Sequence, residues 1–216
     1  MSFISSLMDL LFPPKCAFCR RILAAADDAC CSSCSESLPF ALNSGRQEGE
    51  HYDFCLSPLY YKGVVRKSML RYKFKGASAY ADAYGKILAD CISENPDLDY
   101  DVISWVPLSS IRKRSRGYDQ AMLLALATAL QLNEVAIETL KKPRDVKAQS
   151  ELAGIEERSA NISGAYEVTD PELIVGKTVL LIDDIVTTGS TLSECAKVLL
   201  SAGAKRVVCA SLARGE

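Results

Sequence analysis

Several features that define common protein classes are missing from this 216-residue chain. Lysine and arginine number 25 against 27 aspartates and glutamates, so the formal net charge of −2 gives no global attraction to nucleic acid or to an anionic membrane. Histidine occurs once, at His51, which argues against catalysis by a Ser/His or Cys/His pair. Any site for a polyanion must therefore be a local patch of cations.

Long apolar runs are missing as well. The N-terminal stretch MSFISSLMDLLFPP carries Asp9 and stops at Pro13 and Pro14, after too few residues to span a bilayer. Its apolar residues between positions 4 and 11 have helical spacing, which predicts a short amphipathic helix. A signal peptide is the alternative. Without a membrane span or an export signal, we expect a cytoplasmic protein with reduced cysteines.

Four of the nine cysteines form two Cys-x-x-Cys pairs near the N-terminus. Cys16 and Cys19 form the first pair, and Cys31 and Cys34 form the second after eleven intervening residues. Two such pairs can supply the four thiolates of a closed, tetrahedral Zn²⁺ site that stabilises the fold and does no chemistry. Disulfides and a redox or unligated site are the alternatives, and Cys30 could take the place of Cys31.

Strand-like apolar runs alternate with helical patterns in the rest of the chain. The runs lie at 54–61, 101–106, 178–183 and 206–212, and the helical patterns lie at 62–75, 78–93, 118–130 and 190–201. Strands and helices that alternate at this spacing need crossover connections, which produce a mostly parallel α/β sheet. The predicted organisation is an N-terminal helix with a zinc ribbon at 1–40, a polar linker at 41–53 and an α/β unit at 54–216.

The stretch VLLIDDIVTTGST (179–191) places two carboxylates directly before a loop of small residues. Neither a Walker lysine nor a G-x-G-x-x-G pattern is present here. Backbone N–H groups and hydroxyls of such a loop can wrap one phosphate at the start of the following helix. The acids are Asp183 and Asp184, and the loop consists of Thr187, Thr188, Gly189, Ser190 and Thr191.

These two acids would repel a bare phosphate, so they need a different part of the ligand. Carboxylates accept hydrogen bonds from a sugar diol, or they hold a divalent cation that bridges to further phosphates. A phosphate close to a diol describes ribose 5-phosphate. An ordinary strand end with solvated acids is the alternative.

The segment Asp-Asp-Ile-Val-Thr-Thr-Gly-Ser-Thr (183–191) resembles the motif with which type I phosphoribosyltransferases bind phosphoribosyl diphosphate (PRPP). The resemblance implies that the two acids contact the ribose hydroxyls and that residues 187–191 bind the 5-phosphate. It also implies that Mg²⁺ accompanies PRPP, and that the sheet is the mostly parallel sheet of this fold.

Other segments are similar to a narrower group, the ComF (late competence) family. They are RYKFKG (71–76), PLSSIRKRSRGYDQAMLLA (107–125), the N-terminal Cys-x-x-Cys pairs, and the spaced set Gln149, Leu152, Arg158, Asn161 and Gly164. Asp119 departs from the pattern, because that family usually has Asn at this place.

Membership of this family would imply transfer of the phosphoribosyl group to an acceptor that the sequence does not identify. It would also imply a role in DNA uptake during natural competence, with competence or DNA-translocation proteins as partners. The alternative is a non-catalytic protein that handles single-stranded DNA and keeps a regulatory or vestigial PRPP site.

Cations gather after the predicted strand at 101–106. Such a cluster at the carboxyl end of a parallel strand suits a diphosphate, and the family resemblance places the diphosphate loop here too. A solvated basic loop and a nucleic-acid patch are the alternatives. The candidate residues of this loop are Pro107, Leu108, Arg112 and Arg116.

A second basic region, at 62–76, carries six cations and no acid. On a helix Lys67, Arg71 and Lys75 line one face, while Val65, Met69 and Tyr72 form the opposite, buried stripe. An ordinary solvated face is the simpler interpretation, and the alternative is that the cationic face tracks a single-stranded nucleic-acid backbone. The candidates are Lys67, Arg71, Lys73 and Lys75.

The stretch at 141–161 has few apolar residues and is long for a loop in a compact domain. Loops of this kind often close over active sites as lids, and type I phosphoribosyltransferases, which this chain resembles, have such a loop. Gln149 and Arg158 are the candidates for contact with a ligand, and a simply disordered surface loop is the alternative.

Overall fold

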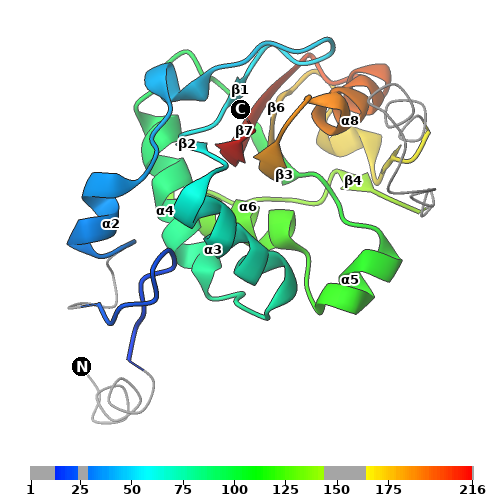
Figure 1. Ribbon diagram of the computed structural model, residues 1–216. Coiled ribbons are helices and arrows are strands. Elements are labelled where there is room, and N and C mark those ends of the chain that lie inside the picture. The colour runs from blue at the N-terminus through cyan, green and yellow to red at the C-terminus, as the bar shows by residue number, and fades with distance from the viewer. Residues whose placement is uncertain (1–12, 24–28, 144–163, 216) are drawn as a thin grey trace.

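The computed structural model describes residues 13–23, 29–143 and 164–215. Its apolar runs form a five-stranded parallel sheet in which β1, β7, β6 and β3 follow one another and β2 also pairs with β7 (Figure 1). The mostly parallel α/β sheet that the sequence predicts is confirmed. The strands are β1 (Cys55–Leu56), β2 (Leu59–Tyr60), β3 (Val102–Trp105), β6 (Thr178–Val186) and β7 (Arg206–Arg214).

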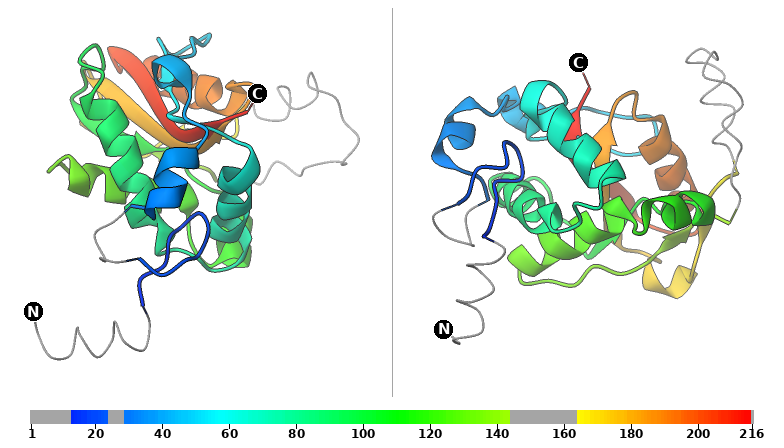
Figure 2. Two further views of the ribbon diagram at one scale, coloured as in Figure 1. Left: turned by 60° about the vertical axis from the view of Figure 1, so that its left-hand side comes forward. Right: turned by 60° about the horizontal axis from the view of Figure 1, so that its bottom comes forward.

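Helices cover both faces of this sheet, as Figure 2 shows from two further sides. Side chains of β6 alternate between the two faces, because successive residues of a strand point in opposite directions. Leu180 and Ile182 lie in one apolar cluster with α4 and α6, whereas Val179 and Leu181 lie in a second cluster with α8. Burial on both faces explains the uninterrupted apolar run. The helices are α4 (Tyr80–Ser93), α6 (Gln120–Gln131) and α8 (Ser190–Ser201).

Three expectations about local structure need correction. The predicted strand at 54–61 is two short strands, because Pro58 has no backbone N–H for a continuous ladder. The basic segment after β3, which we predicted as a loop, is the helix α5 (Ser110–Arg116), ended by Gly117 at φ 84°. The strand predicted to stop at residue 183 continues to Val186, because the long neighbour β7 pairs with it up to that residue.

Strand β6 extends beyond the end of its other neighbour, β3. β3 ends at Trp105, opposite Ile182, while β6 runs on beside β7 for another four residues. Asp183 and Asp184 therefore lie inside the strand, at the place where β3 has already ended. Ligands of open α/β sheets bind in such crevices at the carboxyl ends of strands.

The segment predicted as a linker lies along the edge of the sheet. The backbones of Gln47 and Cys55 exchange two hydrogen bonds, of 3.0 and 2.7 Å, and the N–H of Ser57 donates to the carbonyl of Ser44. Tyr52 is buried. The segment is thus packed on the α/β unit, while the boundaries at residues 40 and 53 stay a prediction.

The remaining elements surround this core. Among them, α3 lies between the N-terminal cysteines and the sheet edge, and β4 pairs with β5 in an antiparallel ribbon. No helix within the described part of the chain has the length and apolar character that crossing a membrane requires. They are α2 (Ser32–Ser37), η1 (Leu42–Gly45), α3 (Gly63–Phe74), β4 (Leu140–Lys141), β5 (Glu167–Val168) and η2 (Pro171–Leu173).

Two predictions fall outside the described residues. They are the amphipathic helix at the N-terminus and most of the predicted lid, including Gln149 and Arg158.

Candidate functional site

The acid pair on β6 divides its carboxylates between two environments, because adjacent residues of a strand point to opposite faces. Asp184, only 7% exposed, forms an ion pair with Lys73 of α3, whose Nζ lies 2.9 Å from Oδ1. Asp183 accepts the backbone N–H of Asp184 at 2.7 Å. Both acids line one pocket of about 210 Å³.

Burial and a neighbouring charge change the pKa of one acid of this pair, Asp183. Burial raises the pKa of Asp183 to about 7, with a further contribution from the charge of Asp184, while Lys73 opposes the rise. An ionised pair is therefore costly in the ligand-free pocket. Groups that bring hydrogen-bond donors or positive charge, such as sugar hydroxyls or a divalent cation, would relieve this cost.

Asp119 has a structural task beside the pocket. Its Oδ2 accepts the backbone N–H of Leu108 at 2.8 Å, and its Oδ1 accepts the N–H of Met122 at 3.2 Å as the N-cap of α6. Burial raises the pKa of Asp119, and these two hydrogen bonds act in the opposite direction. The carboxylate therefore fixes the Pro107–Leu108 loop, which gives the unusual acid at this place a role that needs no ligand.

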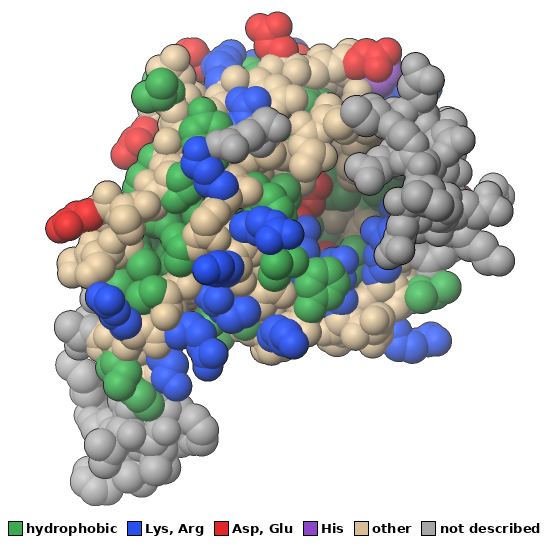
Figure 3. Space-filling model, viewed as in Figure 1, with side chains coloured by type: hydrophobic (Ala, Val, Ile, Leu, Met, Phe, Trp, Pro, Cys, Tyr) green, Lys and Arg blue, Asp and Glu red, His purple; other side chains and the backbone are tan. Residues whose placement is uncertain are grey.

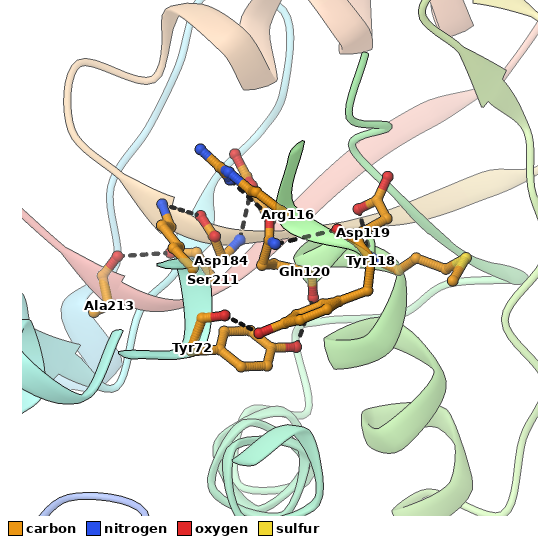
Figure 4. A network of polar contacts seen from close by, with 11 residues as sticks. Tyr72, Arg116, Tyr118, Asp119, Gln120, Asp184, Ser211 and Ala213 are labelled. Atoms are coloured by element: carbon orange, nitrogen blue, oxygen red, sulfur yellow. Dashed lines mark hydrogen bonds and ion pairs between the residues drawn. The ribbon is translucent and has the colours of Figure 1, made fainter. Parts of the chain in front are cut away.

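Cations line the same pocket as the acids. Arg116 of α5 donates to Oε1 of Gln120 at 2.7 Å (Figure 4). Its guanidinium also lies 4.9 Å from the centroid of the Phe74 ring. Burial and the charge of Arg112 lower the pKa of Arg116, while the charge of Asp184 raises it. The pocket thus offers positive and negative groups to one ligand. Its cations are Lys73, Arg112, Arg116 and Lys142.

The surface view shows the same arrangement from outside. Figure 3 shows a hollow in which an acidic side chain is visible, with Lys and Arg side chains near its rim. Such a pocket suits a ligand that carries both hydroxyl groups and phosphates.

The Thr/Gly loop adjoins this pocket. A hollow of about 40 Å³ lies inside the loop and shares Asp183, Ile185 and Thr191 with the larger pocket. The loop passes into α8, whose first backbone N–H groups have no partner within the helix and can bind an anion. Structure therefore brings the predicted phosphate loop, the acid pair and the predicted diphosphate residues together around contiguous space.

Two parts of this loop are held by local contacts. The hydroxyls of Thr188 and Ser190 are hydrogen-bonded at 2.8 Å. Gly189 adopts φ 78°, and a Cβ at this residue would collide with the hydroxyl of Tyr52. Tyr52 thus packs against the loop at Gly189. The sequence did not predict this contact, because Tyr52 lies in a polar stretch that resembles a linker.

The four cysteines of the Cys-x-x-Cys pairs form a separate cluster. Their sulfur atoms all lie within 4.8 Å of one another, and the Sγ atoms of Cys19 and Cys31 are 3.5 Å apart. Zinc–sulfur bonds of about 2.3 Å in a tetrahedron place sulfurs roughly 3.8 Å apart, so the cluster fits a structural Zn²⁺. Of the two adjacent cysteines, Cys31 belongs to the cluster.

The two pairs present their sulfurs differently. The first is a tight turn in which the N–H of Cys16 donates to the carbonyl of Arg21 and Arg20 adopts φ 69°. In the second, Cys31 is the N-cap of α2, so Cys34 sits in the first turn of a helix. Burial and the neighbouring thiols raise the pKa of Cys34, and a bound cation would remove this obstacle to ionisation.

Helix α3 joins the cysteine cluster to the pocket. Arg71 donates to the carbonyls of Ala17 and Phe18, at 2.9 and 2.6 Å, and Ser68 donates to the carbonyl of Ala17. Lys73, two residues further on, pairs with Asp184.

The nucleic-acid candidates on α3 therefore divide into two pairs. Val65, Met69 and Tyr72 form the predicted buried stripe, and each is 0% exposed. Lys67 and Lys75 are exposed as expected. Arg71 is bonded to the cysteine turn instead of being free on the solvent face, which corrects the prediction that it lines one open face with Lys67 and Lys75. Lys73 pairs with Asp184. The reason is that α3 lies between two polar partners, the carbonyls of the cysteine turn and the carboxylate of Asp184.

Comparison with known families identifies two regions in the chain. The family described as "Phosphoribosyl transferase domain" matches residues 110–216, and the family described as "Double zinc ribbon domain" matches residues 7–46. The second match includes all four cysteines of the cluster, which supports a structural Zn²⁺.

Several curated proteins are similar to the chain. "Competence protein ComFC" of Streptococcus pneumoniae is 32% identical over 154 residues, which are 71% of this chain and 65% of that protein. "Competence protein F" of Haemophilus influenzae is 26% identical over 93% of this chain and 96% of its own length. "DNA utilization protein YhgH" of Escherichia coli is 27% identical over 92% of this chain and 96% of its own length.

Proposed function

The chain belongs to the ComF family and joins a double zinc ribbon to a phosphoribosyl transferase domain, and we propose that it binds PRPP with Mg²⁺. Its family fits a role associated with competence. Support for PRPP comes from one observation above all: the acid pair, the phosphate loop and the cations of α5 line contiguous space.

Each part of PRPP has a counterpart in this space. The 5-phosphate suits the N–H groups and hydroxyls of residues 187–191. The ribose hydroxyls suit Asp183 and Asp184, which can accept their hydrogen bonds. The diphosphate suits Arg112 and Arg116 beside the Pro107–Leu108 loop. The oxygen atoms of the two acids are also the ligand type that Mg²⁺ prefers.

Transfer of the phosphoribosyl group would follow from this placement. The bond between the anomeric carbon and the diphosphate oxygen breaks, a bond from the acceptor's nucleophilic atom forms, and the proton of the acceptor leaves to solvent. Asp183 and Asp184 hold the ribose and stabilise the positive charge that develops on it, and Arg112 and Arg116 stabilise the departing diphosphate. Mg²⁺, when bound, neutralises part of the diphosphate charge. The acceptor is the unassigned part of this proposal.

Calorimetric titration with PRPP and Mg²⁺ tests the binding step. Wild-type protein should bind, and Asp184→Asn should weaken binding by about 10- to 100-fold, because a charge-assisted hydrogen bond to a ribose hydroxyl is lost. Asp99→Asn is the matched control, since Asp99 is exposed and lies outside the pocket. Absence of wild-type binding, or full affinity in Asp184→Asn, would contradict the proposal.

A second proposed activity, binding of single-stranded DNA, is favoured by the exposed part of α3. Figure 3 shows Lys and Arg side chains gathered over this region, and the ring of Phe74 is 60% exposed at the end of the helix. Lys67 and Lys75 could contact a phosphate backbone while an exposed ring stacks on a base. DNA handling would also agree with the names of the relatives, and it could occur with or without catalysis in the pocket.

Fluorescence anisotropy with a labelled oligo-dT tests this activity. The double variant Lys67→Ala/Lys75→Ala should bind more weakly. Its affinity should also fall less steeply with salt concentration, by the amount that roughly two phosphate contacts contribute to the slope. Lys205→Ala, an exposed lysine at the start of β7, should behave like the wild type. Binding that is absent or independent of salt in the wild type would remove DNA as a direct ligand, and PRPP binding should not change in either variant.

A further inference from the structure

Lys73 is the one cation of the pocket that comes from α3, and it already has a partner. Its Nζ lies 2.9 Å from Asp184 Oδ1, and the side chains of the two residues are 18% and 10% exposed. The pair lines the candidate ligand pocket together with the α5 arginines. A ligand in this pocket would therefore lie beside the Lys73 ammonium.

The position of this lysine is fixed from the other side of the helix. Arg71 is anchored on the carbonyls of Ala17 and Phe18, and Tyr72 donates its hydroxyl hydrogen to the carbonyl of Gln120 at 2.9 Å. Phe74, the next residue, lies beneath the guanidinium of Arg116. The end of α3 is therefore held against α5 and α6, so the Lys73 side chain can change partner without movement of its backbone.

The chemistry of the proposed ligand places a second anion within reach. In PRPP the diphosphate is attached to the anomeric carbon, which is bonded directly to the carbon that carries the 2-hydroxyl. A cation that touches the carboxylate holding the ribose hydroxyls is thus within a few bonds of the diphosphate. An ammonium on four rotatable methylenes can move between two such oxygens.

We propose that Lys73 exchanges partners when ligand binds: it neutralises Asp184 in the ligand-free pocket, and it contacts the diphosphate in the complex. This proposal rests on the proposed binding of PRPP. The exchange releases Oδ1 of Asp184 to accept a ribose hydroxyl, while the diphosphate gains a third cation besides Arg112 and Arg116. Binding of the diphosphate would in this way free the Asp184 carboxylate to accept the ribose hydroxyl.

Comparison of PRPP with ribose 5-phosphate tests the exchange, because both have the diol and the 5-phosphate and only PRPP has the diphosphate. We expect Lys73→Met to weaken PRPP binding by about 10- to 100-fold. The affinity for ribose 5-phosphate should change by less than about threefold, since only the diphosphate contact is lost. Lys73→Arg should retain most of the PRPP affinity.

Two controls separate this proposal from simpler explanations. Arg66→Met removes an exposed cation from the same helix, outside the pocket, and should leave both affinities unchanged. Unfolding curves show whether Lys73→Met is folded at the temperature of the titration, and Lys73→Arg provides a second, more conservative variant. An equal loss of affinity for both ligands in Lys73→Met would assign Lys73 to the support of Asp184 alone and overturn the exchange.

The proposed function and the exchange fail in distinguishable ways. Wild-type protein that binds neither PRPP nor ribose 5-phosphate contradicts both. Wild-type binding of PRPP with full affinity in Lys73→Met contradicts the exchange and leaves the proposed function standing.

Discussion

The cysteine cluster and the acid pocket both gather groups that repel one another when they are ionised. Four sulfurs lie within 4.8 Å in the cluster, and burial together with the neighbouring thiols raises the pKa of Cys34. In the pocket, Asp183 and Asp184 are adjacent, but the chain itself supplies Lys73, Arg112 and Arg116. The comparison teaches that the cluster gathers only thiols, which suits a metal ion, whereas the pocket combines its acids with cations of the chain itself.

The two regions should therefore respond in opposite ways when one member is removed. Loss of a thiolate removes a ligand from a metal and should destabilise the protein. Loss of the Asp183 carboxylate removes a buried charge beside Asp184 and should stabilise the protein, at the expense of binding.

Loss of a ligating cysteine has the larger expected effect. Cys34→Ser should lose the metal and lower the free energy of unfolding by about 3 kcal/mol or more, because Zn²⁺ binding energy is folding energy in such sites. Urea unfolding followed by circular dichroism measures the change, and metal analysis should give about one zinc per wild-type chain.

A neighbouring cysteine supplies the control for this prediction. Cys30→Ser should keep the metal, since Cys30 is not part of the cluster. Wild-type protein that is folded and free of metal would contradict the structural role of the cluster.

A smaller effect of opposite sign is expected at Asp183. Its pKa is raised to about 7 in the folded protein, so between the ordinary pKa and about 7 the folded state binds this proton more tightly than the unfolded state. The contribution of Asp183 to stability is thus present at low pH and is lost as the pH rises through about 7. Asp183→Asn should therefore become more stable than the wild type as the pH rises.

Urea unfolding at pH 5, 6, 7 and 8 would measure this difference. We expect it to grow with pH to about 1–3 kcal/mol at pH 8, a range that allows for partial solvent screening. Asp99→Asn should show no such trend. A variant that is less stable than the wild type at pH 8 would show that the charge of Asp183 supports the fold.

Much of the fold was predictable because burial leaves local patterns. The apolar run of β6 is uninterrupted because both faces of the strand are buried. On α3, the spacing of Val65, Met69 and Tyr72 indicates the one buried face of the helix. The spacing of the Cys-x-x-Cys pairs likewise predicted the cluster that the four sulfurs form. In each case the physical cause acts between residues that are close in the chain or repeat along one element.

Contacts between distant segments were not predictable in the same way. In the sequence, Lys73 is one of several cations in a basic helix. Its ion pair with Asp184 depends on the position of α3, which the hydrogen bonds of Arg71 to the cysteine turn fix. Tyr52 supports Gly189 only because the 41–53 segment packs along the sheet. The length of β6 beyond β3, which opens the crevice at the acids, is also set by a neighbouring strand.

A crystal structure of the protein with PRPP and Mg²⁺ is the measurement that tests the central claim most directly. The account predicts electron density for the 5-phosphate inside the loop at 187–191 and for the ribose hydroxyls within hydrogen-bond distance of Asp183 and Asp184. It also predicts the diphosphate beside Arg112 and Arg116. A ligand ordered at another place, or a pocket that stays without ligand density at saturating PRPP, would contradict it.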